Sequence, residues 1–287
     1  MLQRLSLSSG LVLAVMLSAC GTPSGGDAGV DSGAPFDAGF DAGPPAVCLV
    51  DKLDAGPDDA GWDGGYDFSC RGVTRSPGGQ GELIITGKTT RAGLTRTGLG
   101  GITVDLLGPD GTVLATTISS PDGGAYRLTF DAGCQPLDGR VRATSSDADA
   151  GFAVAFAVPD APWQYDRSNL ELVMFDPSTQ GLAAAFAGVT LVDGASALAM
   201  TVEDCAGNDV EGAVVDIGDA GDVRYVGTSG LPSNMLSATG ASGDLVIFNV
   251  PADVPSVTVT ARRNGQIIGQ RVVPVQARTV TGTFLSP

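Results

Sequence analysis

Short apolar segments with a period of two make up most of the chain from Glu82 onward. In each segment apolar and polar side chains alternate, which places one face of a strand in a core and the other in water. Gly, Asp and Pro separate the segments, and Asn264-Gly265 between two apolar runs is a strong signal for a tight hairpin. Many short strands at this spacing are typical of β-sandwiches. The clearest segments are 83–86, 102–107, 126–130, 198–202, 257–262 and 280–284.

The last of these segments alternates apolar residues with threonine. Val280 and Phe284 flank Gly282 and are expected to face the core. The threonines between them are expected to face away from it, at Thr279, Thr281 and Thr283.

One short helix is predicted in the connector 176–190. Asp176 is expected to be the N-cap, Pro177 the first helical residue and Gly188 the residue that ends the helix. We interpret this helix as a link between two β-domains, and the alternative is a helix that binds lipid or a partner.

The first 19 residues are predicted to be an export signal. Arg4 supplies a positive start, and the apolar run 11–17 is too short to span a bilayer, which needs about 20 residues. The run ends in Leu17-Ser18-Ala19-Cys20, which resembles the lipobox of bacterial lipoproteins. In that family the chain is cut before the cysteine, which becomes acylated, so the resemblance implies a lipid anchor at Cys20. The alternative is a soluble secreted protein cut near Ala19.

The resemblance also implies a destination. In Gram-negative lipoproteins an Asp after the cysteine resembles an inner-membrane retention signal, whereas this chain has Gly21. We therefore expect a protein anchored in the outer membrane, at its periplasmic face or at the cell surface.

Residues 20–68 are predicted to form a disordered acidic tether. The stretch 21–67 contains ten Asp, no Glu and a single lysine, Lys52. Asp, Gly and Pro are poor strand and helix formers, and few apolar groups are present to offset the entropy of ordering. Its repeated Asp-Ala-Gly units match neither the EF-hand loop nor the β-roll repeat, so we expect no calcium site.

The chain contains no histidine and carries a net charge of −16. The missing histidine excludes Ser-His-Asp and Cys-His nucleophile systems and zinc sites built from His. The negative charge argues against nucleic acid as a partner. We therefore expect a protein that is not an enzyme and holds no metal or cofactor. A His-independent hydrolase that uses a pair of carboxylates is the weakest alternative.

The two halves of the chain resemble each other in the order of their motifs. Segment 101–105 aligns with 212–216, segment 120–128 with 240–248, and segment 140–143 with 257–260. In each copy a small-residue turn and a strand are followed by a turn rich in Asp, Ser and Gly, an aromatic strand, and a strand of Val and Thr.

This order resembles the carboxypeptidase regulatory-like domain, a seven-stranded transthyretin-like sandwich. The second copy is the better match, with 208–215 followed by 241–243 and 245–248. The resemblance implies an extracellular accessory role and brings no catalytic residues. The predicted fold is therefore all-β, with two tandem transthyretin-like or Ig-like sandwiches over 69–175 and 191–287.

Four cysteines remain besides Cys20, namely Cys48, Cys70, Cys134 and Cys205. An even number in an exported chain indicates two disulfides, with three possible connectivities. We favour Cys48–Cys70 and Cys134–Cys205, and Cys70–Cys134 is the rival pairing. A metal site from these cysteines is not expected, because no Cys-x-x-Cys motif is present.

Trp163 and Tyr165 lie in a proline-rich segment that begins at Pro159. We favour a buried position for this aromatic patch, as a plug that closes one sandwich, and the alternative is an exposed patch that stacks on a sugar or docks a partner. The function expected from these features is a non-enzymatic surface lipoprotein that presents β-sandwich structural or interaction modules to an unidentified protein or polysaccharide partner. The alternative is a carbohydrate- or polymer-binding module that uses the aromatic patch.

Overall fold

The computed structural model describes residues 65–70, 81–93, 96–147, 151–159 and 161–287. The predicted signal peptide, Cys20, Cys48 and most of the predicted tether lie outside these residues. The described strands are β1 (Glu82–Arg91), β2 (Thr97–Gly98), β3 (Ile102–Leu107), β4 (Val113–Ile118), β5 (Ala125–Asp131), β6 (Arg140–Ser145), β7 (Val154–Val158), β8 (Arg167–Met174), β9 (Ser196–Val202), β10 (Val214–Asp216), β11 (Asp222–Val226), β12 (Pro232–Ser233), β13 (Asp244–Val250), β14 (Ser256–Arg263), β15 (Gln266–Pro274) and β16 (Thr279–Leu285).

The first half of the chain is a β-sandwich. In one sheet β1 pairs with β2 and β5 in antiparallel fashion and with β8 in parallel. The other layer has the order β4-β3-β6-β7. Side chains from both layers form one core, which includes Ile85, Leu128 and Met174 from the first layer and Val104 and Val141 from the second.

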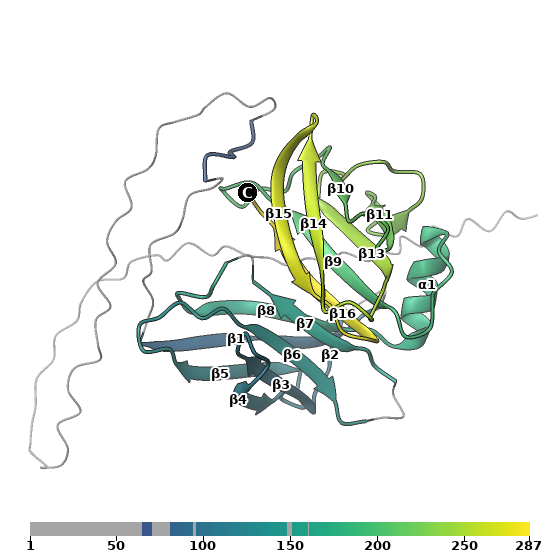
Figure 1. Ribbon diagram of the computed structural model, residues 1–287. Coiled ribbons are helices and arrows are strands. Elements are labelled where there is room, and N and C mark those ends of the chain that lie inside the picture. Colours follow the sequence, from purple (N-terminus) through teal and green to yellow (C-terminus); the bar gives the residue numbers. More distant parts are fainter. Residues whose placement is uncertain (1–64, 71–80, 94–95, 148–150, 160) are drawn as a thin grey trace, which may run out of the picture.

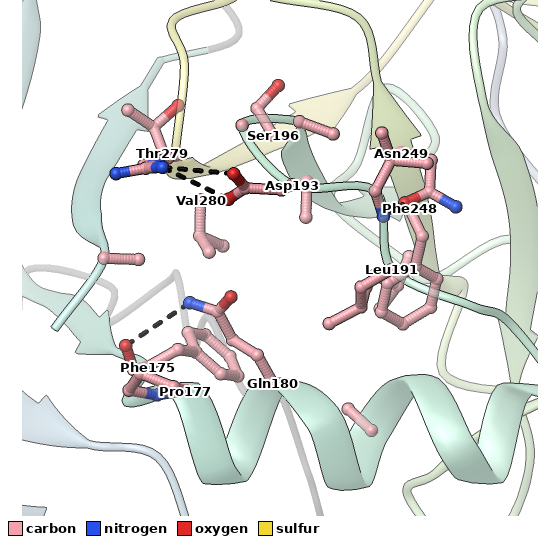
Figure 2. A pocket seen from close by; sticks show the side chains of 18 of the residues that line it. Phe175, Pro177, Gln180, Leu191, Asp193, Ser196, Phe248, Asn249, Thr279 and Val280 are labelled. Carbon is pink, nitrogen blue, oxygen red and sulfur yellow. Dashed lines mark hydrogen bonds and ion pairs between the residues drawn. The ribbon is translucent and has the colours of Figure 1, made fainter. Parts of the chain in front are cut away.

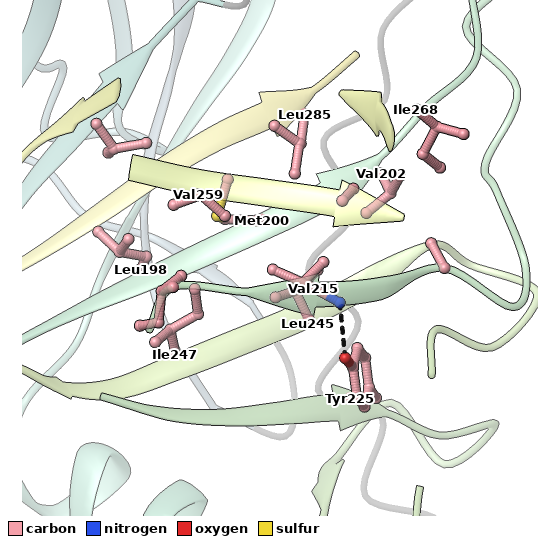
Figure 3. Close-up of a cluster of buried hydrophobic side chains, with 14 of the residues drawn as sticks. Leu198, Met200, Val202, Val215, Tyr225, Leu245, Ile247, Val259, Ile268 and Leu285 are labelled. Atoms are coloured by element: carbon pink, nitrogen blue, oxygen red, sulfur yellow. Dashed lines mark hydrogen bonds between the residues drawn. The ribbon is translucent and has the colours of Figure 1, made fainter. Parts of the chain in front are cut away.

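The second half is a sandwich of the same kind (Figure 3). One layer contains β10, β14 and β15, and the facing layer contains β12, β11, β13, β9 and β16. Leu198, Leu245 and Leu285 pack against Val215 and Val259 across the space between the layers. The period-two pattern therefore predicted the β-sandwich class correctly.

The internal repeat seen in the sequence is confirmed by the strand pairing. In the first half β1 is antiparallel to β5 and parallel to β8, and in the second half β9 is antiparallel to β13 and parallel to β16. The pairs β3–β6 and β6–β7 likewise correspond to β10–β14 and β14–β15. Each half thus has seven strands of three or more residues among those described.

The two sandwiches are joined by one continuous sheet (Figure 1). The last strand, β16, pairs in parallel with β9 of its own half and with β7 of the first half. The resulting sheet has nine strands in the order β12-β11-β13-β9-β16-β7-β6-β3-β4. The segment 191–287 therefore supplies the strand that pairs with the edge strand β7 of the first sandwich. The two halves share a sheet and are not independent domains joined by a linker.

The two cores lie on opposite faces of this shared sheet. Neighbouring residues in a ladder point to the same face, and the register places Val280 beside Ala155 and Thr281 beside Phe156. Ala155 belongs to the first core, whereas Thr281 lies on the same side of β16 as Leu285 of the second core. The face of β9, β13 and β16 that bears Val280 is therefore turned away from the second core.

The orientation expected for the last strand was wrong. Its threonines are the buried side chains, each 2% exposed or less, and Val280 and Phe284 are only partly buried. The hydroxyls of Thr279 and Thr283 are satisfied, because they donate to the carbonyls of Gln276 (2.6 Å) and Val158 (2.8 Å). Burial still alternates along β16, but the more buried face is the one that continues to Leu285 in the second core, and it carries threonines rather than the larger apolar residues.

The predicted helix is confirmed as α1 (Pro177–Ala187). Asp176 is its N-cap and accepts a hydrogen bond from the Thr179 N–H at 2.9 Å, and Gly188 ends the helix in the left-handed conformation at φ 64°. Burial of the Asp176 carboxylate opposes ionisation, but hydrogen bonds from Ser178, Thr179 and Arg91 outweigh it and hold its pKa below the ordinary value. No helix among the described residues is long and apolar enough to cross a membrane.

We predict that Thr281→Pro destabilises both sandwiches together. Proline removes an N–H from a strand that is paired on both sides and leaves the partner carbonyl unsatisfied, at an expected cost of roughly 1–3 kcal/mol. Urea unfolding followed by circular dichroism measures this cost. The matched control is Ile118→Pro in the edge strand β4. Ser119 N–H bonds to Ile102, so the neighbouring N–H of Ile118 points away from the sheet and its loss should cost much less. Equal costs for the two variants would contradict the central role of β16.

Candidate functional site

Residues 66–70, which we call the strap, precede the first sandwich in the chain but lie on the second. Phe68 is 8% exposed and belongs to the core of the second sandwich. The strap backbone is paired as well, because Asp67 N–H donates to Asp204 Oδ2 at 3.0 Å and Cys205 N–H donates to the Asp67 carbonyl at 2.7 Å. The chain therefore contacts the C-terminal half before it builds the N-terminal half.

Tyr66 holds the outer end of the strap. The Glu211 N–H donates to the Tyr66 hydroxyl at 3.1 Å, and the Arg263 guanidinium lies 4.7 Å from the centre of the Tyr66 ring. A cation over an aromatic face is attractive by about 0.5–1 kcal/mol at an exposed site. These contacts correct the predicted end of the tether at residue 68, because residues 66–68 already pack on the second sandwich.

Asp204 is the carboxylate that organises this contact. It is 3% exposed and accepts hydrogen bonds from the N–H groups of Asp67, Ala206 and Asn208 and from the Asn208 amide. Burial of the carboxylate opposes its ionisation, but these hydrogen bonds outweigh the burial and lower the pKa of Asp204. One buried charge thus shapes the turn after β9 and receives the strap at the same time.

A disulfide between Cys70 and Cys205 closes the strap. The pairings favoured from the sequence, Cys48–Cys70 and Cys134–Cys205, were therefore wrong. The rival pairing Cys70–Cys134 is wrong as well, because the strap brings together two cysteines that are 135 positions apart. Cys134 is also disulfide-bonded, and its partner lies outside the described residues. Cys48 lies outside them as well.

The proposed aromatic patch is not formed. Trp163 is 3% exposed in the core of the first sandwich, and its backbone exchanges two hydrogen bonds with Leu137, at 2.8 and 2.9 Å. Tyr165 is 47% exposed and stands apart from that core. The core interpretation is therefore confirmed for Trp163 and wrong for Tyr165, and a sugar platform made of both rings is contradicted.

Two acidic residues of the second half show raised pKa values. Asp244, 8% exposed at the start of β13, accepts a hydrogen bond from the Thr201 hydroxyl at 2.7 Å. Its burial, followed by the nearby charge of Asp209, raises its pKa to about 6, and burial also raises the pKa of Asp209. Neither residue is among those that line two cavities found in the described part of the chain. Among the described residues no group of three or more Cys, Asp and Glu side chains is arranged to hold a metal ion.

A cavity of about 690 Å³ lies between α1 and the shared sheet (Figure 2). The sheet contributes strands β9, β13 and β16, on the face turned away from the second core. The loops before β7 and before β9 close its sides. Its larger apolar lining residues are Phe152, Phe175, Leu191, Val246, Phe248 and Val280.

Most polar side chains of the cavity are already bonded within the protein. Asn249 accepts from the Val192 N–H at 2.8 Å and donates to Thr190 and Asp222, both at 2.9 Å. Ser196 and Thr279 donate to backbone carbonyls. An ion pair between Arg278 and Asp193, at 3.1 Å, stands at the solvent-exposed rim. The cavity therefore offers an apolar interior and a rim without net charge.

Sequence reasoning did not find this cavity. Its lining comes from five separate parts of the chain, 151–153, 175–183, 191–199, 246–249 and 278–280, which meet only in the folded structure. The one available signal was the helix itself, whose eleven residues carry no charge. An uncharged helix on an acidic protein indicates a face that packs on something apolar.

No protein-family model and no curated protein matches this chain. Among solved structures, it is similar to the TIE protein of Bacillus anthracis, at 9% identity and TM-score 0.23, over 71% of this chain and 34% of that protein. It is similar to a streptococcal ancillary pilin at 11% identity and TM-score 0.23, over 72% of this chain and 63% of the pilin. It is also similar to the full-length major pilin RrgB of Streptococcus pneumoniae, at 10% identity and TM-score 0.21, over 74% and 49%. The chain thus spans between about a third and two thirds of these three proteins.

We predict that replacing both Cys70 and Cys205 by serine lowers the free energy of unfolding by roughly 2–5 kcal/mol, because a 135-residue loop is then free in the unfolded chain. Urea unfolding under non-reducing conditions measures the loss. Non-reducing peptide mapping should recover the Cys70 and Cys205 peptides joined. Recovery of Cys70 joined to Cys48 or to Cys134 would contradict the strap.

We predict that Asp244 makes the protein less stable as pH rises. Its folded pKa of about 6 lies above the ordinary value of 3.8, so the folded state binds the proton more tightly than the unfolded state. The free energy of unfolding should therefore fall between pH 4 and pH 6, by at most about 3 kcal/mol from this group. Asp244→Asn should remove this slope, as measured by urea unfolding at several pH values. An identical slope in the variant would refute the assignment. Asp176 acts in the opposite sense, because its stabilisation is lost only as the pH falls below about 4.

Proposed function

We propose that this chain is a non-enzymatic lipoprotein that holds two fused β-sandwiches away from a bacterial outer membrane. The membrane contact is the lipid that the lipobox-like sequence ending at Cys20 implies. Three features support the proposal, namely the lipobox-like sequence, the acidic tract after it, and the way the folded body begins. The strap carries the argument, because it is the point at which the acidic tract meets the folded body.

The strap fits a tether attachment for a mechanical reason. Force applied to the N-terminal side of Cys70 passes through the disulfide to Cys205 and so reaches the second sandwich directly. All of β1 to β8 lies inside the covalent loop between these two cysteines, outside that path. When a folded body is pulled through its tether, a covalent bond at the point of attachment prevents the attached segment from detaching from the body.

The acidic tract suits a spacer. A flexible chain of 27 residues, from 21 to 47, has an r.m.s. span of roughly 30 Å, and repulsion between its aspartates extends it further. That span is enough to lift a folded body clear of lipid headgroups. The resemblance to carboxypeptidase regulatory-like domains fits the same role, since it implies an accessory module rather than a catalyst.

We predict that Cys20→Ala releases the protein from membranes. Several acyl chains on one cysteine make anchoring stable, because each buried methylene contributes about 0.8 kcal/mol. Fractionation of cells into soluble and membrane pools, followed by immunoblotting, measures the release. The matched control is Cys70→Ser with Cys205→Ser, which removes two cysteines but should leave the protein with the membrane. Membrane retention of the Cys20→Ala protein would refute the anchor.

A further inference from the structure

The cavity under α1 has the size and build of a ligand site. Its volume of about 690 Å³ falls within the range of 300–1,000 Å³ that is usual for small-molecule pockets. It is bounded by a sheet and a helix, and both are regular elements that hold a fixed shape. It also lies where two structural units meet, which is a common position for binding sites.

The space exists because one face of the sheet carries small side chains. Ala197 and Ala199 on β9 point toward α1, and the intervening Leu198 and Met200 fill the second core. Ala183 on the helix also borders the space. Larger residues at these positions would have closed the gap between helix and sheet. The protein therefore leaves an apolar surface exposed to water, and an apolar ligand would remove it from water.

The lack of net charge in the cavity indicates that its ligand is uncharged. Arg278 and Asp193 cancel each other at the rim, and both side chains are exposed, at 72% and 92%. Gln180 reaches from α1 toward the space and makes a 3.4 Å contact with the Phe175 carbonyl (Figure 2). A buried ionic group would find no unpaired counter-charge among the lining residues. An apolar chain with an uncharged polar head suits both the interior and the rim.

We propose that this cavity binds the single apolar chain of an uncharged amphiphile, with the chain packed between α1 and strands β9, β13 and β16 and the head at the Arg278–Asp193 rim. This site does not depend on lipidation of Cys20. The proposal of a ligand site and the proposal of a lipid anchor can therefore be tested independently.

Octyl, nonyl and decyl maltoside are suitable probes below their micelle concentrations. Isothermal titration of the purified full chain should show about a fourfold gain in affinity for each added methylene, since each buried methylene adds about 0.8 kcal/mol. An affinity that does not change with chain length would overturn the proposal, because the chain would then not be buried.

Two cavity-filling variants test the position of the site. Ala197→Trp fills the space from the sheet, and Gln180→Trp fills it from the helix, where the native side chain is only partly buried. Each should weaken decyl maltoside binding at least tenfold. The matched control is Ala125→Trp, which adds the same ring at an exposed position on β5 and should leave binding unchanged. Unchanged binding by Gln180→Trp, with its fold verified by circular dichroism, would overturn the proposal.

Two further variants distinguish the cavity from other modes of binding. Phe186 is 48% exposed on α1 and does not line the cavity, so Phe186→Ser should leave affinity within twofold. Loss of binding in this variant would indicate adsorption to the outer face of α1 and would refute the cavity. Arg278→Gln should also stay within twofold, and a large loss would show that the ligand is held by charge.

The natural chain could come from a membrane lipid or from a free amphiphile. Mass spectrometry of an organic extract of the protein, purified without detergent, identifies which of the two is carried. A single-chain membrane lipid and a free single-chain compound, each with an uncharged head, would both support the site and would name different sources, whereas a two-chain lipid would contradict the single-chain assignment. An extract without either compound, together with no maltoside binding, would overturn the proposal.

Discussion

The double pairing of β16 is the interaction on which the rest of the structure depends. This strand joins β9 on one side and β7 on the other, both in parallel. Without it each sandwich would expose an open strand edge, and such edges pair readily with other chains. With it, two seven-stranded units share one sheet, and the end of the chain closes both. The most C-terminal strand therefore determines whether the N-terminal half is covered.

The shared sheet also explains why a helix stands at the junction. The two cores lie on opposite faces, so the strands of the second half have a face that the second sandwich does not cover. Ala183, Ala184 and Ala187 of α1 pack with Phe248 on this face. The helix covers part of it, and the remainder forms the cavity. A connector between domains thus becomes part of a candidate site because of where the sheet continues.

The strap adds a covalent closure to the same junction of halves. Phe68 enters the second core, Asp204 receives the strap backbone, and the Cys70–Cys205 disulfide fixes it. The strap thus contacts the second half before the first half is formed along the chain, and β9 to β16 complete the second half after it. Such an arrangement has few local signals, because its contacts join residues more than a hundred positions apart.

Several features could be predicted from residues that are close in sequence. Asp176, Pro177 and Gly188 fixed the limits of α1 through capping chemistry, and the turn-strand order revealed the repeat that the pairing of β9, β13 and β16 reproduces. The core position favoured for the Trp163–Tyr165 segment holds for Trp163 but not for Tyr165. Burial alternates with period two along β16 as well, but the wrong face was assigned to the core: the threonines lie on the side of Leu285 and the second core, and Val280 lines the cavity.

By itself, the sequence determined the all-β class, the two related halves, the short helix and its caps, since turn and cap residues act within a few positions. The tertiary structure alone decided that the halves share a sheet, that Cys70 pairs with Cys205, and that a cavity opens beneath α1. Those outcomes depend on which strand edges and which distant segments meet in space. Strands pair through backbone hydrogen bonds, and every residue except proline offers the same backbone groups. The sequence of a strand therefore indicates that it will pair, but not which strand will be its partner.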